Sequence, residues 1–528
     1  MPESKNKYSL RLHDNARFDY ISVHADTSPE ALENIRNKRY AMKKHYTRIN
    51  TEFAARHGIH PIHSSGYSHY MIAELTEREA IAVRKDACVQ SVTLYEDVPI
   101  VNHQSDIISR QIKSDNITGS HSVSFPPYLG NGVGIGVVSA QNLTFIPQAL
   151  QLTGLEEQGR IVYLEGASAT EEAVHSTVVT SIIVGKSVSF DVVEYRGVAP
   201  LSTVYFAPSF DKIGMYEAIE KCVDNGASII NYSAGEAFPD GEYSDFDFQI
   251  DTLIYNVGFC FVTSAGNASF VSSPATACNG ITVGNAQTKD SRETAEMPPY
   301  QMFCKAQDDC SAYIQAEYLP NKPDISAPGT YVHYINSVGK IEFNLYGTSF
   351  AAPYVTGVAA QIVEKYPRAA FSPLIIKAVL LCGANPRAID SRDDPPVAEF
   401  DRLRVKSGAG LLDSVSSLES TEFKSGTLSL GKSENTSIML RKGQTVRAVL
   451  CYFKSPQDIS SGFTGNITLE LHTPGGTRAA FSDSIRENVK VIEYTSGVSG
   501  EHILKAVNSQ NRDARDETYA LAWRILPA

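Results

Sequence analysis

Several features of secreted, membrane-bound and nucleic-acid-binding proteins are missing from this sequence. The N-terminus, MPESKNKYSLRLHDNARFDY, lacks the apolar segment of a signal peptide, and no run of about 18 apolar residues could span a membrane. The net charge of −12 disfavours nucleic acid or an anionic membrane as a partner. We therefore expect a soluble, acidic, cytoplasmic protein.

Cysteine is also sparse, with eight residues in 528, most of them inside apolar stretches. Cysteines of this kind favour free buried thiols over disulfides. Cys304 and Cys310 form the one local pair in a polar loop. No cysteine and histidine spacing resembles a zinc site, so the sequence indicates no metal cofactor.

The chain is too long for a single hydrophobic core, and its patterns change twice. Residues 1–105 predict a small α+β unit. Its expected elements are a strand at 18–23, a helix from Pro29 to about His57, and a strand, a short helix and a second strand between 69 and 97. Residues 103–131 are polar and read as a linker.

From Gly132 onward, short apolar runs alternate with helical segments, which is typical of a parallel sheet covered by helices. We place this α/β domain at 118–418. Beyond Leu418 the helical periodicity stops, and runs such as TVRAVLCYF and NITLELHT are separated by Gly, Ser, Asn and Pro. This pattern predicts an antiparallel β-sandwich at 420–528.

The strongest chemical signal is Gly347-Thr348-Ser349-Phe350-Ala351-Ala352-Pro353, followed by an apolar helical segment. A turn here would deliver Ser349 to a helix N-terminus, where unpaired N–H groups can help bind an oxyanion. The full stretch resembles the nucleophile motif of the subtilase family of serine proteases. That resemblance implies a subtilisin-like parallel sheet flanked by helices, and Ser349 as the nucleophile.

Other segments resemble the family in the same order, over almost all of 130–415. They are Gly197–Pro200 (GVAP), Ser264–Asn267 (SAGN), Lys322–Gly329 (KPDISAPG) and Ser407–Leu411 (SGAGL). By this resemblance Asn267 would donate its side-chain amide to the oxyanion. Tyr232, Ser233, Ala234 and Gly235 would form the edge strand that pairs with substrate, and Ala234 is smaller than the usual leucine.

His175, in AVHSTVV, corresponds to the family's catalytic base, although Ser176 replaces the glycine that normally follows it. A serine hydroxyl is a poor nucleophile until a neighbouring base takes its proton, and imidazole does so near neutral pH. The resemblance therefore implies that His175 activates Ser349.

The acid of the triad is missing. The family's Asp-x-Gly motif ends the first sheet strand, and here that position reads Ser139-Ala140-Gln141. Ser139 could hold the imidazole by a hydrogen bond but cannot stabilise the imidazolium as a carboxylate does. Another acid could replace it, and the nearby candidates are Glu165, Glu171, Glu172 and Asp211, each of which is also an ordinary surface charge.

Two functions therefore stay open: a serine endopeptidase with a weakened triad, and a pseudoprotease that binds peptides or a protein partner without turnover. Retention of Ser349, His175 and Asn267 favours the first, and loss of the acid favours the second. Substrate specificity is not readable from the sequence.

The N-terminal unit resembles the subtilase propeptide, a ferredoxin-like α+β prodomain, in the stretches Ala73–Ala80 and Val89–Val92. An unrelated α+β domain is the alternative. The resemblance implies an intramolecular inhibitor whose tail, Leu94–His103, enters the active-site cleft, with cleavage near His103-Gln104. The C-terminal sandwich resembles β-domains appended to many subtilases. Calcium is common in the family, but no site can be assigned. Asn267-Ala268-Ser269 is also a formal glycosylation sequon, which argues weakly against a glycosylating compartment.

Overall fold

The computed structural model describes most of the elements expected above. The described residues are 4–13, 29–95, 100–102, 128–139, 160–164, 174–185, 188–190, 193–209, 211–236, 243–268, 270–287, 301–302, 320–335, 341–386, 406–460, 465–510 and 516–526. Several residues and segments named above lie outside this set, namely the expected strand at 18–23, most of the expected linker, and His103, Gln141, Glu165, Glu171, Glu172, Cys304 and Cys310. The other six cysteines are free thiols, and all but Cys88 are buried.

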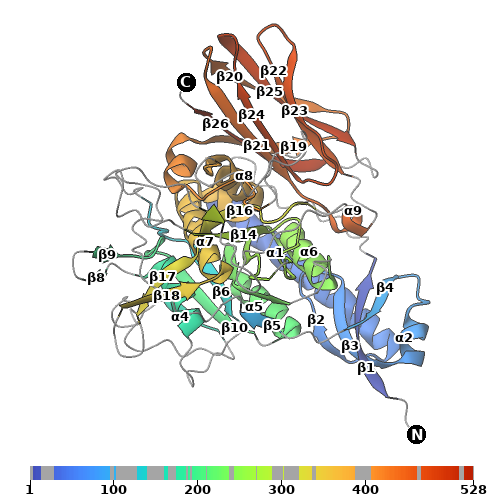
Figure 1. The fold of residues 1–528 in the computed structure, drawn as a ribbon. Helices are drawn as coiled ribbons and strands as arrows, with labels where there is room; N and C mark the ends of the chain where they lie inside the picture. The colour runs from blue at the N-terminus through green and yellow to red at the C-terminus, as the bar shows by residue number, and fades with distance from the viewer. Residues whose placement is uncertain are drawn as a thin grey trace.

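The N-terminal unit is a four-stranded antiparallel sheet with two helices (Figure 1). Its elements are β1 (Lys5–Leu12), α1 (Pro29–His57), β2 (Pro61–Ser64), β3 (Tyr70–Thr76), α2 (Glu77–Val83) and β4 (Val89–Leu94). The strand order β2-β3-β1-β4 with this βαββαβ sequence is ferredoxin-like. Helix α2 begins at Thr76 because Thr76 and Glu79 form a capping box.

The central unit is built on seven parallel strands, in the order β7-β10-β6-β11-β13-β14-β16, with β15 antiparallel beside β14. This arrangement confirms the α/β class. The strands are β6 (Gly134–Ser139), β7 (Ile161–Tyr163), β10 (Thr203–Pro208), β11 (Ile229–Tyr232), β13 (Cys260–Ser264), β14 (Ile281–Gln287), β15 (Gln301–Met302) and β16 (Ile325–Pro328).

Helices surround this sheet, and three two-stranded pairs lie beside it. The helices are α4 (Val174–Val184), α5 (Lys212–Asp224), α6 (Asp245–Val257), α7 (Thr348–Lys365), η2 (Pro367–Phe371) and α8 (Pro373–Gly383). The pairs are β5 (Ile100–Asn102) with β12 (Ala234–Glu236), β8 (Val188–Phe190) with β9 (Val193–Tyr195), and β17 (Thr330–Ile335) with β18 (Ile341–Tyr346). Helix α5 contacts β6 and β10, whereas α7 contacts β11, β13, β14 and β16.

The C-terminal unit is a sandwich of two four-stranded antiparallel sheets, joined to the central unit through η3 (Ser416–Ser420). One sheet has the order β19-β26-β21-β24 and the other β20-β25-β22-β23. The elements are β19 (Glu422–Leu428), β20 (Ser433–Leu440), β21 (Thr445–Tyr452), α9 (Pro456–Ser460), β22 (Asn466–His472), β23 (Arg478–Ser482), β24 (Val489–Thr495), β25 (Gly500–Gln510) and β26 (Glu517–Leu526). Alternating buried residues such as Ile467, Leu469 and Leu471 fill the space between the sheets.

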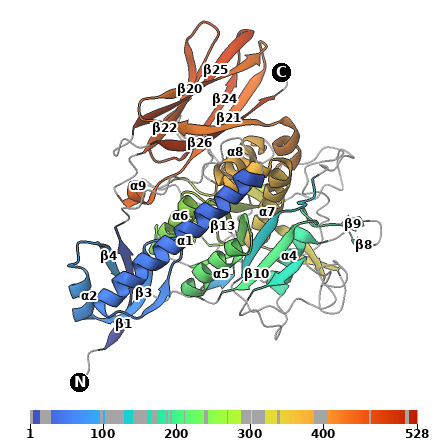
Figure 2. The same cartoon turned by 180° about the vertical axis from the view of Figure 1, so that it is seen from behind.

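The N-terminal unit and the sandwich each have a core of their own, and both also contribute residues to the core of the central unit. Tyr46 of α1 and Ile72 of β3 belong to the same buried cluster as the central sheet, and so do Val449 of β21 and Ala520 of β26. In Figure 2, α1 runs from the N-terminal unit along the central unit, and its Arg39 donates to the carbonyl of Val257 at 3.1 Å. The expected boundaries at 105, 118, 418 and 420 stay predictions.

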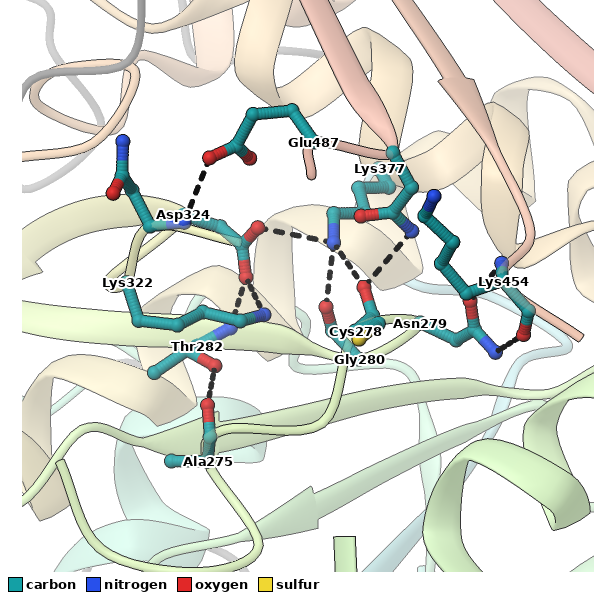
Figure 3. Close-up of polar contacts among 12 residues, drawn as sticks. Ala275, Cys278, Asn279, Gly280, Thr282, Lys322, Asp324, Lys377, Lys454 and Glu487 are labelled. Carbon is teal, nitrogen blue, oxygen red and sulfur yellow. Dashed lines mark hydrogen bonds and ion pairs between the residues drawn. The ribbon is translucent and has the colours of Figure 1, made fainter. Parts of the chain in front are cut away.

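A buried group of charges lies where the central unit meets the sandwich (Figure 3). Asp324 accepts from Lys322 at 2.7 Å and pairs with Lys377 at 3.0 Å, and all three side chains are almost fully buried. Lys377 also donates to the carbonyls of Cys278 and Gly280. Burial alone would raise the pKa of Asp324, but the two ammonium groups hold it below its usual value.

Reciprocal hydrogen bonds continue this junction into the sandwich. Asn279 donates to the carbonyl of Lys454 at 2.8 Å and accepts from its N–H at 2.9 Å, and Asn488 donates to the carbonyl of Cys278. No helix in the described parts of the chain is both long and apolar enough to cross a bilayer.

Candidate active site

Ser349 is the second residue of α7, at the carboxyl side of the central sheet. The helix begins after Gly347, whose φ of 144° only glycine adopts without strain. Pro353 lies inside the helix and has no N–H, so it cannot donate to the carbonyl of Ser349 four residues earlier. The hydroxyl of Ser233 donates to that carbonyl instead, at 3.0 Å. The GTSFAAP motif thus fixes the backbone of Ser349 through a neighbouring loop.

The side chain of Ser349 is fully buried and is engaged by the same loop. Its hydroxyl donates to the carbonyl of Ser233 at 2.9 Å. Asn231 supports this loop, because its amide donates to the hydroxyl of Ser233 and its carbonyl accepts from Thr356 of α7. Ser233 therefore holds Ser349 at both its carbonyl and its hydroxyl.

Asn267 lies against the first turn of the same helix. Its side-chain carbonyl accepts from the N–H of Thr348 at 2.9 Å and from the Thr348 hydroxyl at 3.0 Å. The Thr348 hydroxyl also accepts from the N–H of Gly266 at 3.1 Å. These bonds orient the amide group, leaving its NH₂ on the side away from the helix backbone.

His175 is the second residue of α4, which contacts α7. Its imidazole ring lies 5.6 Å from the ring of Phe350, the residue after Ser349. The side chain is only 3% exposed, and neither ring nitrogen has a hydrogen-bond partner among the described residues. Burial lowers the pKa of His175 to about 4, so the imidazole is neutral at pH 7.

Ser139 ends β6 and lines the same small cavity as His175. The expected hydrogen bond between them is not present, because the Ser139 hydroxyl is bonded to the hydroxyl of Ser176 at 2.6 Å. The two positions that the sequence analysis interpreted as departures from the family motif are therefore in direct contact. Asp211, one of the candidate replacement acids, caps α5 by accepting from Gly214 at 2.7 Å.

The expected substrate-pairing segment is divided between two strands. Tyr232 ends the central strand β11 and its side chain is buried in the core, so it is not part of an edge strand. The edge begins after Ser233, at Ala234 of β12. This short strand pairs antiparallel with β5, with Ala234 opposite Asn102, Gly235 opposite Val101 and Glu236 opposite Ile100.

The other motif segments brace this site. A Cβ atom on Gly357 of α7 would lie 2.4 Å from Val198, so the glycine lets the GVAP turn pack against the helix. A Cβ atom on Gly329 would lie 2.6 Å from the carbonyl oxygen of Gly347. A Cβ atom on Gly408 would lie 2.3 Å from the carbonyl oxygen of Asp324. The glycines thus allow close backbone approach around α7.

Two residues with direct contacts in the site were not expected as site residues. Ser176 was noted only as a departure from glycine, yet the simultaneous change at Ser139 was a signal that the two side chains interact. Thr348 stands inside the nucleophile motif and binds Asn267. No group of three or more His, Cys, Asp or Glu side chains in the described ranges could hold a metal ion, so we assign no calcium site.

Comparisons with known proteins agree with this architecture. Residues 157–404 match the model of the Peptidase S8 subtilase family. This match includes His175, Asn267 and Ser349 but begins after Ser139. The chain is 26% identical to a thermostable alkaline protease of Halalkalibacterium halodurans over 303 residues, 56% of this chain and 72% of that protein.

Similar solved structures include fervidolysin from Fervidobacterium pennivorans, a keratinolytic enzyme related to subtilisin. It is 14% identical, with a TM-score of 0.49, covering 96% of this chain and 69% of that chain. Another is a serine-to-alanine mutant of the epidermin leader peptide processing serine protease of Staphylococcus aureus, 15% identical with a TM-score of 0.49, covering 79% of this chain and 99% of that chain. Residues 157–404 are thus similar to a Peptidase S8 subtilase domain, and the central unit has the subtilisin-like fold.

Proposed function

We propose that this protein is a serine endopeptidase in which Ser349 is the nucleophile and His175 the general base. The observation that carries this proposal is the position of Ser349 at the N-terminus of α7, between Ser233 and Asn267 and next to the helix that carries His175. In the reaction, the Ser349 oxygen attacks the scissile carbonyl while His175 accepts its proton. The Asn267 amide and the helix N-terminus would bind the oxyanion.

Without the acid, we expect Ser349 and His175 to hydrolyse peptide bonds more slowly but not to lose the activity. In subtilisin, loss of the acid alone lowers turnover by about 3 × 10⁴, compared with about 2 × 10⁶ for loss of the serine or the histidine. A pair of Ser349 and His175 with intact oxyanion donors is therefore expected to be slow and measurable. Ser139 stands in place of the acid and carries no charge.

A pseudoprotease that binds peptides or a protein partner is the second candidate. It is favoured by the hydroxyl of Ser349, which is bonded to the carbonyl of Ser233, and by the buried ring of His175, which has no partner among the described residues. A site held in this way could bind an extended peptide along β12 without cleaving it.

Labelling with a fluorophosphonate probe separates the two. An endopeptidase should be labelled covalently at Ser349, located by mass spectrometry of the digested protein. A pseudoprotease should remain unlabelled while still binding peptides. Because the probe reports nucleophilicity and needs no known substrate, it works before specificity is known.

We also propose that the N-terminal unit is a docked intramolecular inhibitor. Carboxylates at the ends of α5 and α6 receive hydrogen bonds from this unit. Glu220 accepts from Ser65 at 2.7 Å, Asp224 accepts from Tyr67 at 2.7 Å and Asp245 accepts from Tyr70 at 2.8 Å. With the shared core, these contacts support a unit that stays attached to the central unit.

The tail of this unit supports the same proposal. Pairing of β5 with β12 is the arrangement expected of a substrate strand on the edge beside a protease nucleophile. The described pairing reaches Asn102 opposite Ala234, the residue that follows Ser233, to which Ser349 is bonded. His103 itself lies outside the described residues. We therefore propose that cleavage occurs near His103-Gln104. The test is to follow the intact mass of the wild-type chain over days, with Ser349→Ala as the uncut control.

A further inference from the structure

His175 is a buried base whose polar atoms need partners. It is 3% exposed, and both ring nitrogens lack a hydrogen-bond partner within the described chain. A buried polar atom left unpaired costs about 1–3 kcal/mol, so such atoms are usually paired with protein or with ordered water. One ring nitrogen must face Ser349 for base catalysis, and the other needs an acceptor that fixes the tautomer.

A cavity beside the ring has room for a water molecule that can be this acceptor. It has a volume of about 10 Å³, roughly what one water molecule requires. It is lined by Val137, Val138, Ser139, His175, Ser176, Val179, Asn231 and Ser233. Buried water molecules typically have two to four polar partners. This lining includes three serines, and because the hydroxyl of Ser233 is engaged with Asn231 and Ser349, those of Ser139 and Ser176 are the candidate partners.

The two serines act together here. Their hydroxyls are 2.6 Å apart, although they stand on different elements, Ser139 at the end of β6 and Ser176 in the first turn of α4. Glycine at 176 would leave Ser139 without this bond. The pair also brings two hydroxyl dipoles to the position where a triad carboxylate would otherwise accept from the ring.

We propose that Ser176 is a positioning residue, which together with Ser139 holds one water molecule against Nδ1 of His175. The Nδ1–H donates to this water, and Nε2 is left as the acceptor for the proton of Ser349. We call the two hydroxyls and the water the relay, although no proton moves along it. The relay thus orients the base and selects its tautomer, but being uncharged it stabilises the imidazolium less than a carboxylate. This inference rests on the proposed function of His175.

The test compares Ser176→Ala with Thr180→Val. Thr180 is a matched control, because it is buried in the same helix, its hydroxyl has no partner in the described structure, and it does not line the cavity. Ser176→Ala should slow fluorophosphonate labelling of the full chain at least about tenfold, while Thr180→Val stays within about twofold of wild type. Thermal unfolding of each variant shows whether it folds, and Ser139→Ala replaces Ser176→Ala if that variant does not.

A second readout does not depend on activity. In the ¹⁵N spectrum of histidine-labelled protein, His175 should be the Nδ1–H tautomer in wild type and in Thr180→Val, and a mixture in Ser176→Ala. A crystal structure should show water bonded to Nδ1 and to both hydroxyls. Equal labelling of Ser176→Ala and wild type, or a cavity without that water, would overturn the relay. If neither wild type nor Val101→Pro, a variant designed to release the tail from β12, is labelled while the water and tautomer are in place, the endopeptidase is rejected and the relay stands.

Discussion

The hydroxyl of Ser349 donates its hydrogen bond to the carbonyl oxygen of Ser233, 2.9 Å away, and not to the imidazole of His175. The proposed nucleophile must therefore break one hydrogen bond before its base can take the proton. In the proposed mechanism, the barrier of that rotation adds to the lower rate expected for a triad without a carboxylate at position 139. Both effects lower the rate, and they can be separated by substitution.

We expect Ser349→Ala to abolish labelling by a fluorophosphonate and any peptidase activity, because the neighbouring hydroxyl, that of Thr348, is engaged by Asn267 and Gly266. The measurement is the labelled fraction by intact mass. Ser433→Ala, which removes an exposed serine from the sandwich, should label like wild type. Labelling that persists in Ser349→Ala would show that the nucleophile is another residue.

Restoring the acid should raise the labelling rate. Ser139→Asp places a carboxylate beside the cavity of His175. Ser176→Gly removes the hydroxyl that would otherwise bond to this carboxylate in place of the imidazole. We expect the double variant to label at least about tenfold faster than wild type, within the roughly 3 × 10⁴ that an acid contributes in subtilisin. The triple variant with Ser349→Ala should be unlabelled. A double variant that folds and is no faster would mean that position 139 does not face the base.

The pH dependence should be unusually flat. Burial lowers the pKa of His175 from 6.5 to about 4, and the neutral imidazole is the form that accepts the proton of Ser349. The labelling rate should therefore hold from neutral pH to about pH 5 and fall only near pH 4. His472→Gln, a change in the sandwich, should give the same profile. A half-maximal rate near pH 6.5 would contradict a desolvated base.

The same pKa predicts a loss of stability in acid. Between about pH 6.5 and pH 4, the unfolded chain binds a proton at residue 175 that the native chain does not bind. The stability contributed by neutral His175 is thus present above pH 6.5 and is lost as the pH falls through this window. Urea denaturation of wild type and His175→Gln at pH 7 and pH 5 should show a smaller loss in the variant.

The buried charges of Figure 3 should dominate the stability of the junction. Asp324→Asn leaves two buried ammonium groups without a carboxylate, so we expect a loss of about 3–5 kcal/mol in the free energy of unfolding. Lys377→Met should cost less, because the pair of Lys322 and Asp324 remains. The half-exposed pair of Lys424 and Glu434 provides the control, and Lys424→Met should cost under about 1 kcal/mol. If Lys377→Met or Lys424→Met lowered the free energy of unfolding more than Asp324→Asn does, the two buried lysines would not need the carboxylate of Asp324.

Freeing the tail should expose the nucleophile. Val101→Pro removes a backbone N–H from the strand that pairs with Gly235, so β5 should leave β12. We expect the uncut Val101→Pro chain to label faster than wild type, whereas Val101→Ala, which keeps the N–H, should differ little. If Val101→Pro labels no faster, the tail does not obstruct the site.

Local patterns allowed much of the fold to be predicted from the sequence. Helix α1 follows the predicted span from Pro29 to His57, and α2 begins at the threonine of its capping box. Strand β1 was missed, because the alternation of buried Tyr8, Leu10 and Leu12 in a polar N-terminus is weak beside that of 18–23. Short strands such as β12 depend on a partner distant in sequence, which no local pattern reveals.

In the candidate site too, features set by a local motif were predicted, and contacts between distant residues were not. Ser349 was predicted as the nucleophile because its motif is continuous and its residues act locally. Gly347 allows the turn before α7, and Pro353 leaves the carbonyl of Ser349 without a helical donor. The contact between Ser139 and Ser176 joins positions 37 residues apart, and their spacing predicts no such bond. Nor could the sequence predict that Ser349 would bond to the carbonyl of Ser233, since that choice depends on side-chain rotation in the folded site.

The short strand β5 has a consequence for how inhibition should be measured. Among the described residues, three pairs hold it to β12, whereas the body of its unit is fixed through the shared core. If the tail inhibits as we propose, it is a tethered competitor, whose effective concentration at the cleft is on the order of millimolar and does not fall when the protein is diluted. Substrates added at micromolar levels would meet an occupied site in the intact chain. One cut near His103 would leave the tail joined to that docked body, so the inhibition that we propose would end only when the whole unit dissociates.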